Sequence, residues 1–186
     1  MNQLISLLVE NEAGALMRVA GVLTSRGYNI ESLTVAKTLD PTLASMTIVA
    51  DVAEESRALL IKQITRLVNV VKAVDLTESN AVQRELALIK VSSVKPEMRS
   101  SVAKEAEIFR ARIVDVAPTH YTLEVTGSPD KIDALIDLLH HYGDVEMTRS
   151  GSMAMARMPA NRLPYPMFRQ EPSEEESQTT PAVESK

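Results

Sequence analysis

The chain has 186 residues, of which 24% are charged and 45% hydrophobic, and its formal net charge is −5. The absence of cysteine excludes disulfides, thiolate nucleophiles and cysteine-ligated metal centres, while the mild acidity and an aromatic content of 3% disfavour nucleic acid as a partner. No apolar run approaches the roughly 18 residues of a membrane span, and residues 1–9 lack the basic flank of a targeting segment. We therefore expect a soluble cytoplasmic protein with no membrane partner.

Residues 1–77 alternate between the periodicities of strands and helices. Residues 4–9 form an apolar run that is typical of a strand buried on both faces. A stripe with helical spacing follows, and Gly27 is expected to end this helix in a left-handed conformation. The stripe consists of Leu16, Val19, Ala20 and Leu23.

Two β-rich runs, a second helix and a last strand complete this first unit. Residues 30–36 and 46–50 are predicted strands joined by a turn at residues 40–42, and residues 70–74 form the last strand. The second helical stripe consists of Leu60, Ile61, Ile64, Leu67 and Val68. The order βαββαβ is that of ferredoxin-like domains.

The same order repeats in residues 84–158, after a connection at residues 78–83. Strands are predicted at residues 86–94, 113–116, 121–126 and 145–148. One helix begins near Pro96, and another begins at Pro129 after a capping Ser128. The apolar positions of these helices are Val102, Ala106 and Phe109, then Ile132, Leu135, Ile136 and Leu139. The sequence thus predicts an α+β fold of two tandem ferredoxin-like units.

Residues 159–186 differ in character from the rest. They contain five of the nine prolines, no glycine and an acidic, polar end. Such a segment buries too little apolar surface to offset its ordering entropy, so we expect a disordered, proline-rich acidic tail.

The three histidines are the residues most suited to an enzyme or metal site. Asp137 precedes His140 and His141 by three and four residues, so one helical face could present a carboxylate and an imidazole. The alternative is a polar helix end, where histidine also suits the helix dipole. No Ser-His-Asp pattern or phosphate-binding glycine loop stands out. We expect neither a metal site nor catalysis by this chain alone.

The first strand–helix junction, residues 10–16, is the best candidate for a binding site. Asn11 can cap the helix, Gly14 lets a ligand approach the backbone, and free N–H groups at a helix start bind carboxylates. Asn29 adds a side-chain amide at what we expect to be a neighbouring end of the sheet. Together these groups suit a free α-amino acid with a branched aliphatic side chain. A capped helix and a turn with nothing bound remain the alternative.

Residues 10–16 (Glu-Asn-Glu-Ala-Gly-Ala-Leu) and 26–35 (Arg-Gly-Tyr-Asn-Ile-Glu-Ser-Leu-Thr-Val) together resemble the regulatory, or small, subunit of acetohydroxyacid synthase, also called acetolactate synthase. The likeness continues at residues 40–43, 46–48, 106–110, 113–116 and 149–151. It covers residues 1–158 and leaves out the proline-rich tail.

The resemblance implies that residues 1–77 are an ACT domain, which pairs with a second copy to form a homodimer with a continuous sheet. Valine would bind at the interface, between the loop of one subunit and the second strand of its partner. The effector-binding residues it implies are Asn11, Ala13, Gly14, Ala15 and Leu16, together with Asn29 and Ile30.

The resemblance also implies a partner and a role. A separate large subunit would carry thiamine diphosphate, Mg²⁺ and FAD and would condense two pyruvates to 2-acetolactate, at the start of branched-chain amino-acid biosynthesis. The present chain would hold no cofactor, raise the activity of that subunit and confer feedback inhibition by valine. Strand edges and helices of residues 1–77 are the expected contact surface.

Two other interpretations remain open. A stand-alone ACT-type amino-acid sensor or transcription regulator would need a DNA-reading element, and the sequence contains no basic helix-turn-helix pattern. An autonomous enzyme would have to use residues such as His140 and His141. A purified protein that binds valine but not DNA, and that has no activity of its own, would exclude both.

Overall fold

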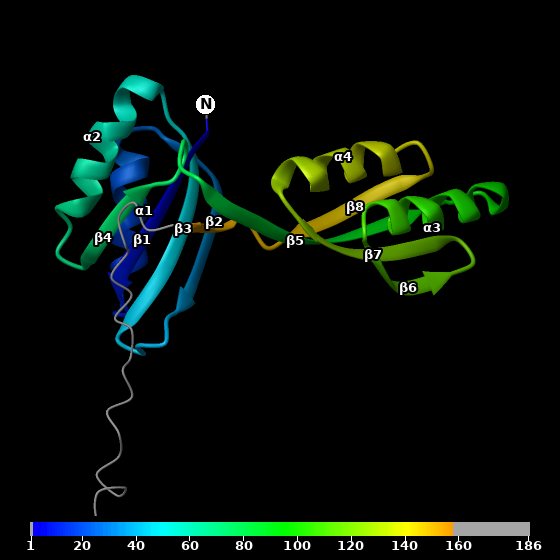
Figure 1. Cartoon of the computed structure of the whole chain (residues 1–186), viewed down its shortest axis with the longest axis horizontal. Coiled ribbons are helices and arrows are strands. Elements are labelled where there is room, and N and C mark those ends of the chain that lie inside the picture. The colour runs from blue at the N-terminus through cyan, green and yellow to red at the C-terminus, as the bar shows by residue number, and fades with distance from the viewer. Residues whose placement is uncertain (1, 158–186) are drawn as a thin grey trace, which may run out of the picture.

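The computed structural model describes residues 2–157, and it confirms two tandem βαββαβ units (Figure 1). The first unit consists of β1 (Asn2–Glu10), α1 (Ala15–Ser25), β2 (Asn29–Lys37), β3 (Leu43–Asp51), α2 (Glu54–Thr65) and β4 (Val70–Asp75). The second consists of β5 (Ala81–Ser92), the 3₁₀ turn η1 (Pro96–Met98), α3 (Arg99–Ile108), β6 (Arg112–Ala117), β7 (His120–Gly127), α4 (Pro129–Leu139) and β8 (Asp144–Arg149). A short strand, β9 (Met153–Ala156), follows. The tail expected at residues 159–186 lies outside the described residues.

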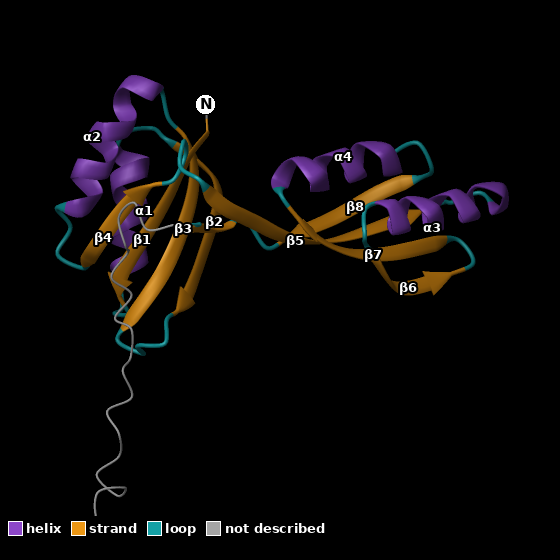
Figure 2. Cartoon of the chain, in the orientation of Figure 1, coloured by secondary structure: helices purple, strands orange, loops and turns teal. Residues whose placement is uncertain are grey.

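Both sheets have the same strand order. It is β2-β3-β1-β4 in the first unit and β6-β7-β5-β8 in the second. Each sheet carries its two helices on one face (Figure 2). Because β1 and β2 both pair antiparallel with β3, these two strands run in the same direction.

The apolar residues of the predicted strands and helices pack into two separate cores, one between the helices and the sheet of each unit. In β1 every residue from Gln3 to Val9 is buried, which confirms the strand expected to be covered on both faces. Val19 and Leu23 of α1 pack on the helix-bearing face, and Gly27 has the expected left-handed φ of 72°. In the second unit, all four apolar residues of the α4 stripe are buried.

The second helix is shorter than its stripe predicts. It ends at Thr65, where the N–H groups of Arg66 and Leu67 bond back to Gln63 and Ile64 and turn the chain toward β4. Leu67 still packs against the core, but Val68 is 91% exposed. The prediction that Val68 belongs to the buried stripe is therefore wrong.

Part of the connection predicted at residues 78–83 is a strand. β5 begins at Ala81 instead of residue 86, and its residues 81–84 pair with β9, for which no strand was predicted. Ala81, Ala154 and Ala156 pack over Leu4, Val49 and Leu76, on the sheet face opposite the helices of the first unit. Alanine is a weak strand former, so this alanine-rich ribbon gives little β signal in the sequence.

A close contact fixes the segment between β8 and β9 against β2. Gly151 has a φ of 81°, and a Cβ atom there would lie 2.8 Å from Ser32 Oγ. The N–H of Ser152 donates to Ser32 Oγ at 2.8 Å, and Thr34 Oγ1 donates to the Ser152 carbonyl at 2.6 Å. A side chain at position 151 would separate these groups.

A buried carboxylate anchors the same junction. Glu85 is only 5% exposed, and Arg149 reaches it through Nε at 2.7 Å and Nη2 at 2.6 Å. Ser152 Oγ also donates to Glu85, while Arg149 Nη1 bonds Asp133 on α4 at 2.6 Å. Burial lowers the pKa of Arg149, but hydrogen bonds to Asp133 and Glu85 outweigh it, and the net pKa lies above its ordinary value.

Replacing Arg149 with Met should destabilise the protein, because it leaves the buried Glu85 carboxylate without its cation. Removing one partner of a buried ion pair costs about 3 kcal/mol of unfolding free energy. Urea denaturation measures the loss. The double variant Glu85→Gln/Arg149→Met should recover part of it, since no charge is then left buried.

The matched control is Lys90→Met, which breaks the exposed pair between Lys90 and Glu146, 3.8 Å apart. That pair should contribute roughly 0.5 kcal/mol or less. Equal effects of Lys90→Met and Arg149→Met would show that the junction network adds no stability beyond an exposed ion pair.

Candidate effector-binding site

The β1–α1 loop is held by the turn between β2 and β3. The Asn11 N–H donates to the Thr42 carbonyl at 2.7 Å, and Asn11 Nδ2 donates to the Pro41 carbonyl at 2.9 Å. The prediction that Asn11 caps α1 is therefore wrong, because its side chain is engaged with this turn. The N-cap of α1 is Gly14, three residues further on, and no side chain caps the helix.

The supporting turn is itself fixed by Asp40. Its Oδ1 accepts hydrogen bonds from Thr42 Oγ1 at 2.6 Å and from the Thr42 N–H at 2.9 Å. These bonds favour the ionised carboxylate, so the pKa of Asp40 lies below its ordinary value. The turn predicted at residues 40–42 is confirmed, with the Leu43 N–H closing on the Asp40 carbonyl at 3.0 Å.

A buried asparagine that sequence reasoning missed braces the loop from the other side. Asn69, in the α2–β4 connection, is 4% exposed, and its Nδ2 donates to Glu10 at 2.8 Å and to Glu12 at 3.3 Å. Its Oδ1 accepts a bond from Arg18 Nη1, and its carbonyl accepts the Glu10 N–H at 2.8 Å. One side chain therefore joins the start of the loop to the first turn of α1.

The loop presents an open glycine and free backbone donors to solvent. Gly14 has a φ of 86°, and nothing lies within 4 Å of the position that a Cβ would take. Among the described residues, the N–H groups of Gly14 and Leu16 have no hydrogen-bond acceptor, whereas the Ala15 N–H donates to the Glu12 carbonyl at 3.2 Å. The helix start can therefore accept a carboxylate, as its sequence suggests.

The side chains of the predicted site residues divide into two groups. Asn11, Ala13 and Leu16 are exposed, with Leu16 at 40%. Ala15 is 4% exposed and belongs to the core, so its side chain does not face a ligand in the loop.

Asn29 and Ile30 do not lie beside this loop within one chain. The strand register sets Asn29 opposite Asp51, which pairs with Asn2 at the start of β1, whereas the loop follows the other end of β1. A nine-residue strand such as β1 spans roughly 27 Å. The expectation of neighbouring ends is therefore wrong for a single chain, because β2 runs parallel to β1.

The histidines do not form the arrangement that their spacing allowed. His141 Nδ1 faces the main-chain carbonyls of Asp137 and Leu138, each at 3.1 Å, rather than the Asp137 carboxylate. His120 Nε2 lies 3.0 Å from Asp115 Oδ2. Within residues 2–157, no three His, Asp or Glu side chains are grouped to hold a metal ion, and no helix is long and apolar enough to cross a membrane.

Comparison with known families assigns both units. The model described as "AHAS small subunit-like ACT domain" matches residues 5–72. The model described as "Small subunit of acetolactate synthase" matches residues 84–158. Fold, loop and matches together define a regulatory protein of the ACT class.

Relatives and a solved structure agree along most of the chain. A probable acetolactate synthase small subunit of Archaeoglobus fulgidus is 46% identical over 157 residues, which cover 84% of this chain and 98% of that protein. The acetolactate synthase isozyme 3 small subunit of Escherichia coli is 41% identical over 158 residues, with coverage of 84% and 96%. The crystal structure of the acetolactate synthase small subunit from Thermotoga maritima superimposes with a TM-score of 0.74 at 35% identity, covering 85% of this chain and 98% of that one. The chain belongs to the family of acetolactate synthase small subunits.

Replacing Asn69 with Asp should loosen the β1–α1 loop. The substitution removes the amide donor and sets a third carboxylate against Glu10 and Glu12, so we expect a loss of about 2 kcal/mol of unfolding free energy. Urea denaturation measures it. Asn80→Asp, at an exposed loop position, is the matched control, and a similar change in both variants would contradict the bracing role.

Proposed function

We propose that this chain is the non-catalytic regulatory subunit of an acetolactate synthase. Its partner is a separate catalytic subunit that carries thiamine diphosphate, Mg²⁺ and FAD and converts two pyruvates to 2-acetolactate and CO₂. The chain raises the activity of that subunit and makes it sensitive to valine, in the biosynthesis of valine, leucine and isoleucine. The open Gly14 loop, in the ACT unit of a chain of this family, is the observation that carries the proposal.

The effector site is completed by a second copy of the chain. Within the described residues β2 pairs only with β3, so its other edge is available to another strand. Antiparallel pairing of two β2 strands about a two-fold axis sets the end of one strand opposite the start of the other. Lys37, at the end of β2, is level with Val9 of β1, so it lies at the same end of the sheet as the Gly14 loop. The loop of one subunit thereby meets Asn29 and Ile30 of the other.

The two halves of this site offer complementary groups to an α-amino acid. The free N–H groups of Gly14 and Leu16 suit the carboxylate. Asn29 Nδ2 donates to Glu31, which leaves Asn29 Oδ1 to accept from the ammonium group. The exposed part of Leu16 and the half-buried Ile30 supply apolar surface for a branched side chain.

Inhibition follows from coupling between the interface within the regulatory dimer and the interface with the catalytic subunit. The regulatory dimer favours an active arrangement of the catalytic subunit, and valine favours a different arrangement of the dimer. A tenfold loss of activity needs about 1.4 kcal/mol of differential valine binding between the two arrangements.

Titration of this protein into the catalytic subunit tests the proposed function. We expect acetolactate formation to rise to a plateau as the protein is added, and valine to reverse the rise. The catalytic subunit alone, with and without valine, is the control. Binding of valine without any stimulation of the catalytic subunit would mean that the chain is an amino-acid sensor with another partner.

Replacing Gly14 with Asp should abolish inhibition by valine. The new carboxylate would repel the ligand carboxylate and fill the approach to the helix start. Gly14→Asn is the matched variant, because asparagine tolerates a positive φ and has the same size without the charge. We expect Asp to raise the valine concentration for half-inhibition more than tenfold, and Asn to raise it less.

Stimulation of the catalytic subunit in the absence of valine reports whether each Gly14 variant folds and assembles. Retention of full valine sensitivity by a stimulating Gly14→Asp protein would overturn the site, while leaving the regulatory role intact.

A further inference from the structure

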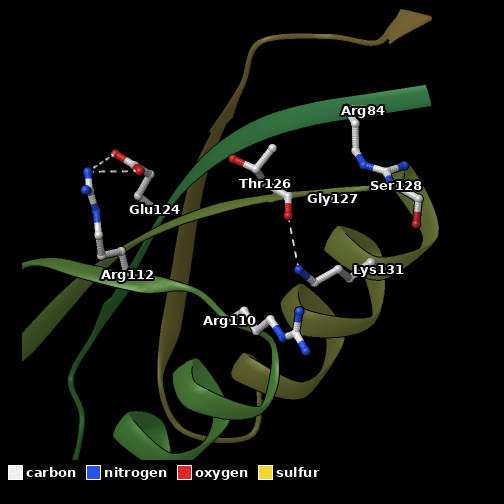
Figure 3. Close-up of a pocket in the computed structure, with 8 residues that line it drawn as sticks. All are labelled: Arg84, Arg110, Arg112, Glu124, Thr126, Gly127, Ser128 and Lys131. Atoms are coloured by element: carbon white, nitrogen blue, oxygen red, sulfur yellow. Dashed lines mark hydrogen bonds and ion pairs between the residues drawn. The ribbon is translucent and has the colours of Figure 1, made fainter. Parts of the chain in front are cut away.

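A cavity lies in the second unit, far along the sequence from the Gly14 loop. It has a volume of about 490 Å³ and opens where β7 passes into α4 (Figure 3). Four cationic side chains line it, and we call it the basic cavity after them: Arg84, Arg110, Arg112 and Lys131. Glu124 is its one acidic side chain.

The charge in the basic cavity is not balanced. Glu124 pairs with Arg112 at 3.1 Å, which neutralises one cation. Arg84 Nη1 donates to the Gln83 carbonyl at 2.7 Å, and Lys131 Nζ donates to the Thr126 carbonyl at 3.0 Å. Within residues 2–157, neither cation pairs with a carboxylate. The Arg110 guanidinium has no partner among the described residues. Three uncompensated cations therefore share one cavity, in a chain whose net charge is −5.

Two of these cations lie at unusual backbone positions. A Cβ at Gly127 would lie 2.6 Å from Lys131 Cδ, so the glycine is what lets the lysine stem lie over the end of β7. Arg110 follows the last turn of α3 with a φ of 53°, a conformation that usually takes glycine. Figure 3 shows Arg110 in the connection that follows α3 and Lys131 on α4, and both residues line the cavity.

Cations gathered in a cavity without counter-charges repel one another, and a bound anion removes that cost. Guanidinium groups form paired hydrogen bonds with phosphate oxygens, and an ammonium group adds a point charge. Thr126 and Ser128 contribute hydroxyl groups at the same opening. The charge and the donor set both suit a small ligand with at least two negative charges.

We propose that the basic cavity binds a small polyanion of the phosphate type, with Arg110 and Lys131 as its main partners and Arg84 beside them. The site is independent of the proposed valine site, because it lies in the other unit and shares no residue with it.

Calorimetric titration of the full chain with inorganic pyrophosphate tests this proposal. We expect saturable binding of one pyrophosphate per chain. Binding should weaken when the salt concentration rises from 50 to 300 mM, because the Debye length then falls to about 0.4 of its starting value. Arg110→Gly should weaken binding at least tenfold. Because glycine suits a φ of 53°, this variant should unfold at no lower temperature than the original protein.

Two controls separate the cavity from general effects. Ser93→Gly changes the other non-glycine residue with a positive φ, 60°, without changing the charge. Arg66→Ala removes an exposed arginine from the first unit. Both should bind pyrophosphate within twofold of the original protein.

Three results would overturn the proposal. The first is the absence of saturable binding, and the second is an equal loss of affinity in Arg66→Ala and Arg110→Gly, which would indicate only overall charge. The third is equal affinity for citrate, a carboxylate polyanion, which would exclude phosphate selectivity.

Discussion

The direction of β2 is the constraint on which the regulatory architecture depends. Since β1 and β2 run parallel, the Gly14 loop and Asn29 are separated by the length of a strand within one chain. No movement of a loop closes that distance while the sheet stays intact. Antiparallel pairing at the free β2 edge closes it by symmetry, and it produces two equivalent sites in one step. In the proposed dimer, the effector site and the dimer interface therefore share one sheet edge.

β2 also contacts the segment that leads out of the second unit. Ser32 and Thr34 of β2 bond to Ser152, and Gly151 fits closely against them. From Ser152 a continuous set of hydrogen bonds leads through Glu85 to Arg149 and on to Asp133 of α4. β2 thus lies between the edge proposed for the second copy and the junction with the second unit. The proposed effector site is therefore connected to the second unit through packed, hydrogen-bonded residues rather than through a loose linker.

The sequence predicted most of what depends on local patterns, Val68 and the Asn11 cap excepted, and missed what depends on distant partners. The apolar run of β1 and the α4 stripe identified their elements, because burial repeats at the period of each element. The β5–β9 ribbon was missed, since its alanines are buried only when the first sheet lies beneath them. In the site, Gly14 could be recognised from its residue type and its place before a helix. Asn69 could not, because its carboxylate partners lie 57 and 59 residues away. The error over Asn29 was avoidable, since a strand–helix–strand crossover already makes the two strands parallel and sets the start of the second far from the end of the first.

The net charge of the chain likewise does not reveal the charge that the fold gathers at one place. A net charge of −5 argues against a broad basic surface, yet Arg84, Arg110 and Lys131 reach one opening from three separate segments of the chain. They are separated by 26 and 21 positions in the sequence, so no short window of the chain contains all three. The field at a point depends on the nearest charges, because more distant ones are screened beyond roughly 10 Å at 0.1 M salt. An acidic protein can therefore contain a cavity that attracts anions, and only the fold determines where it lies.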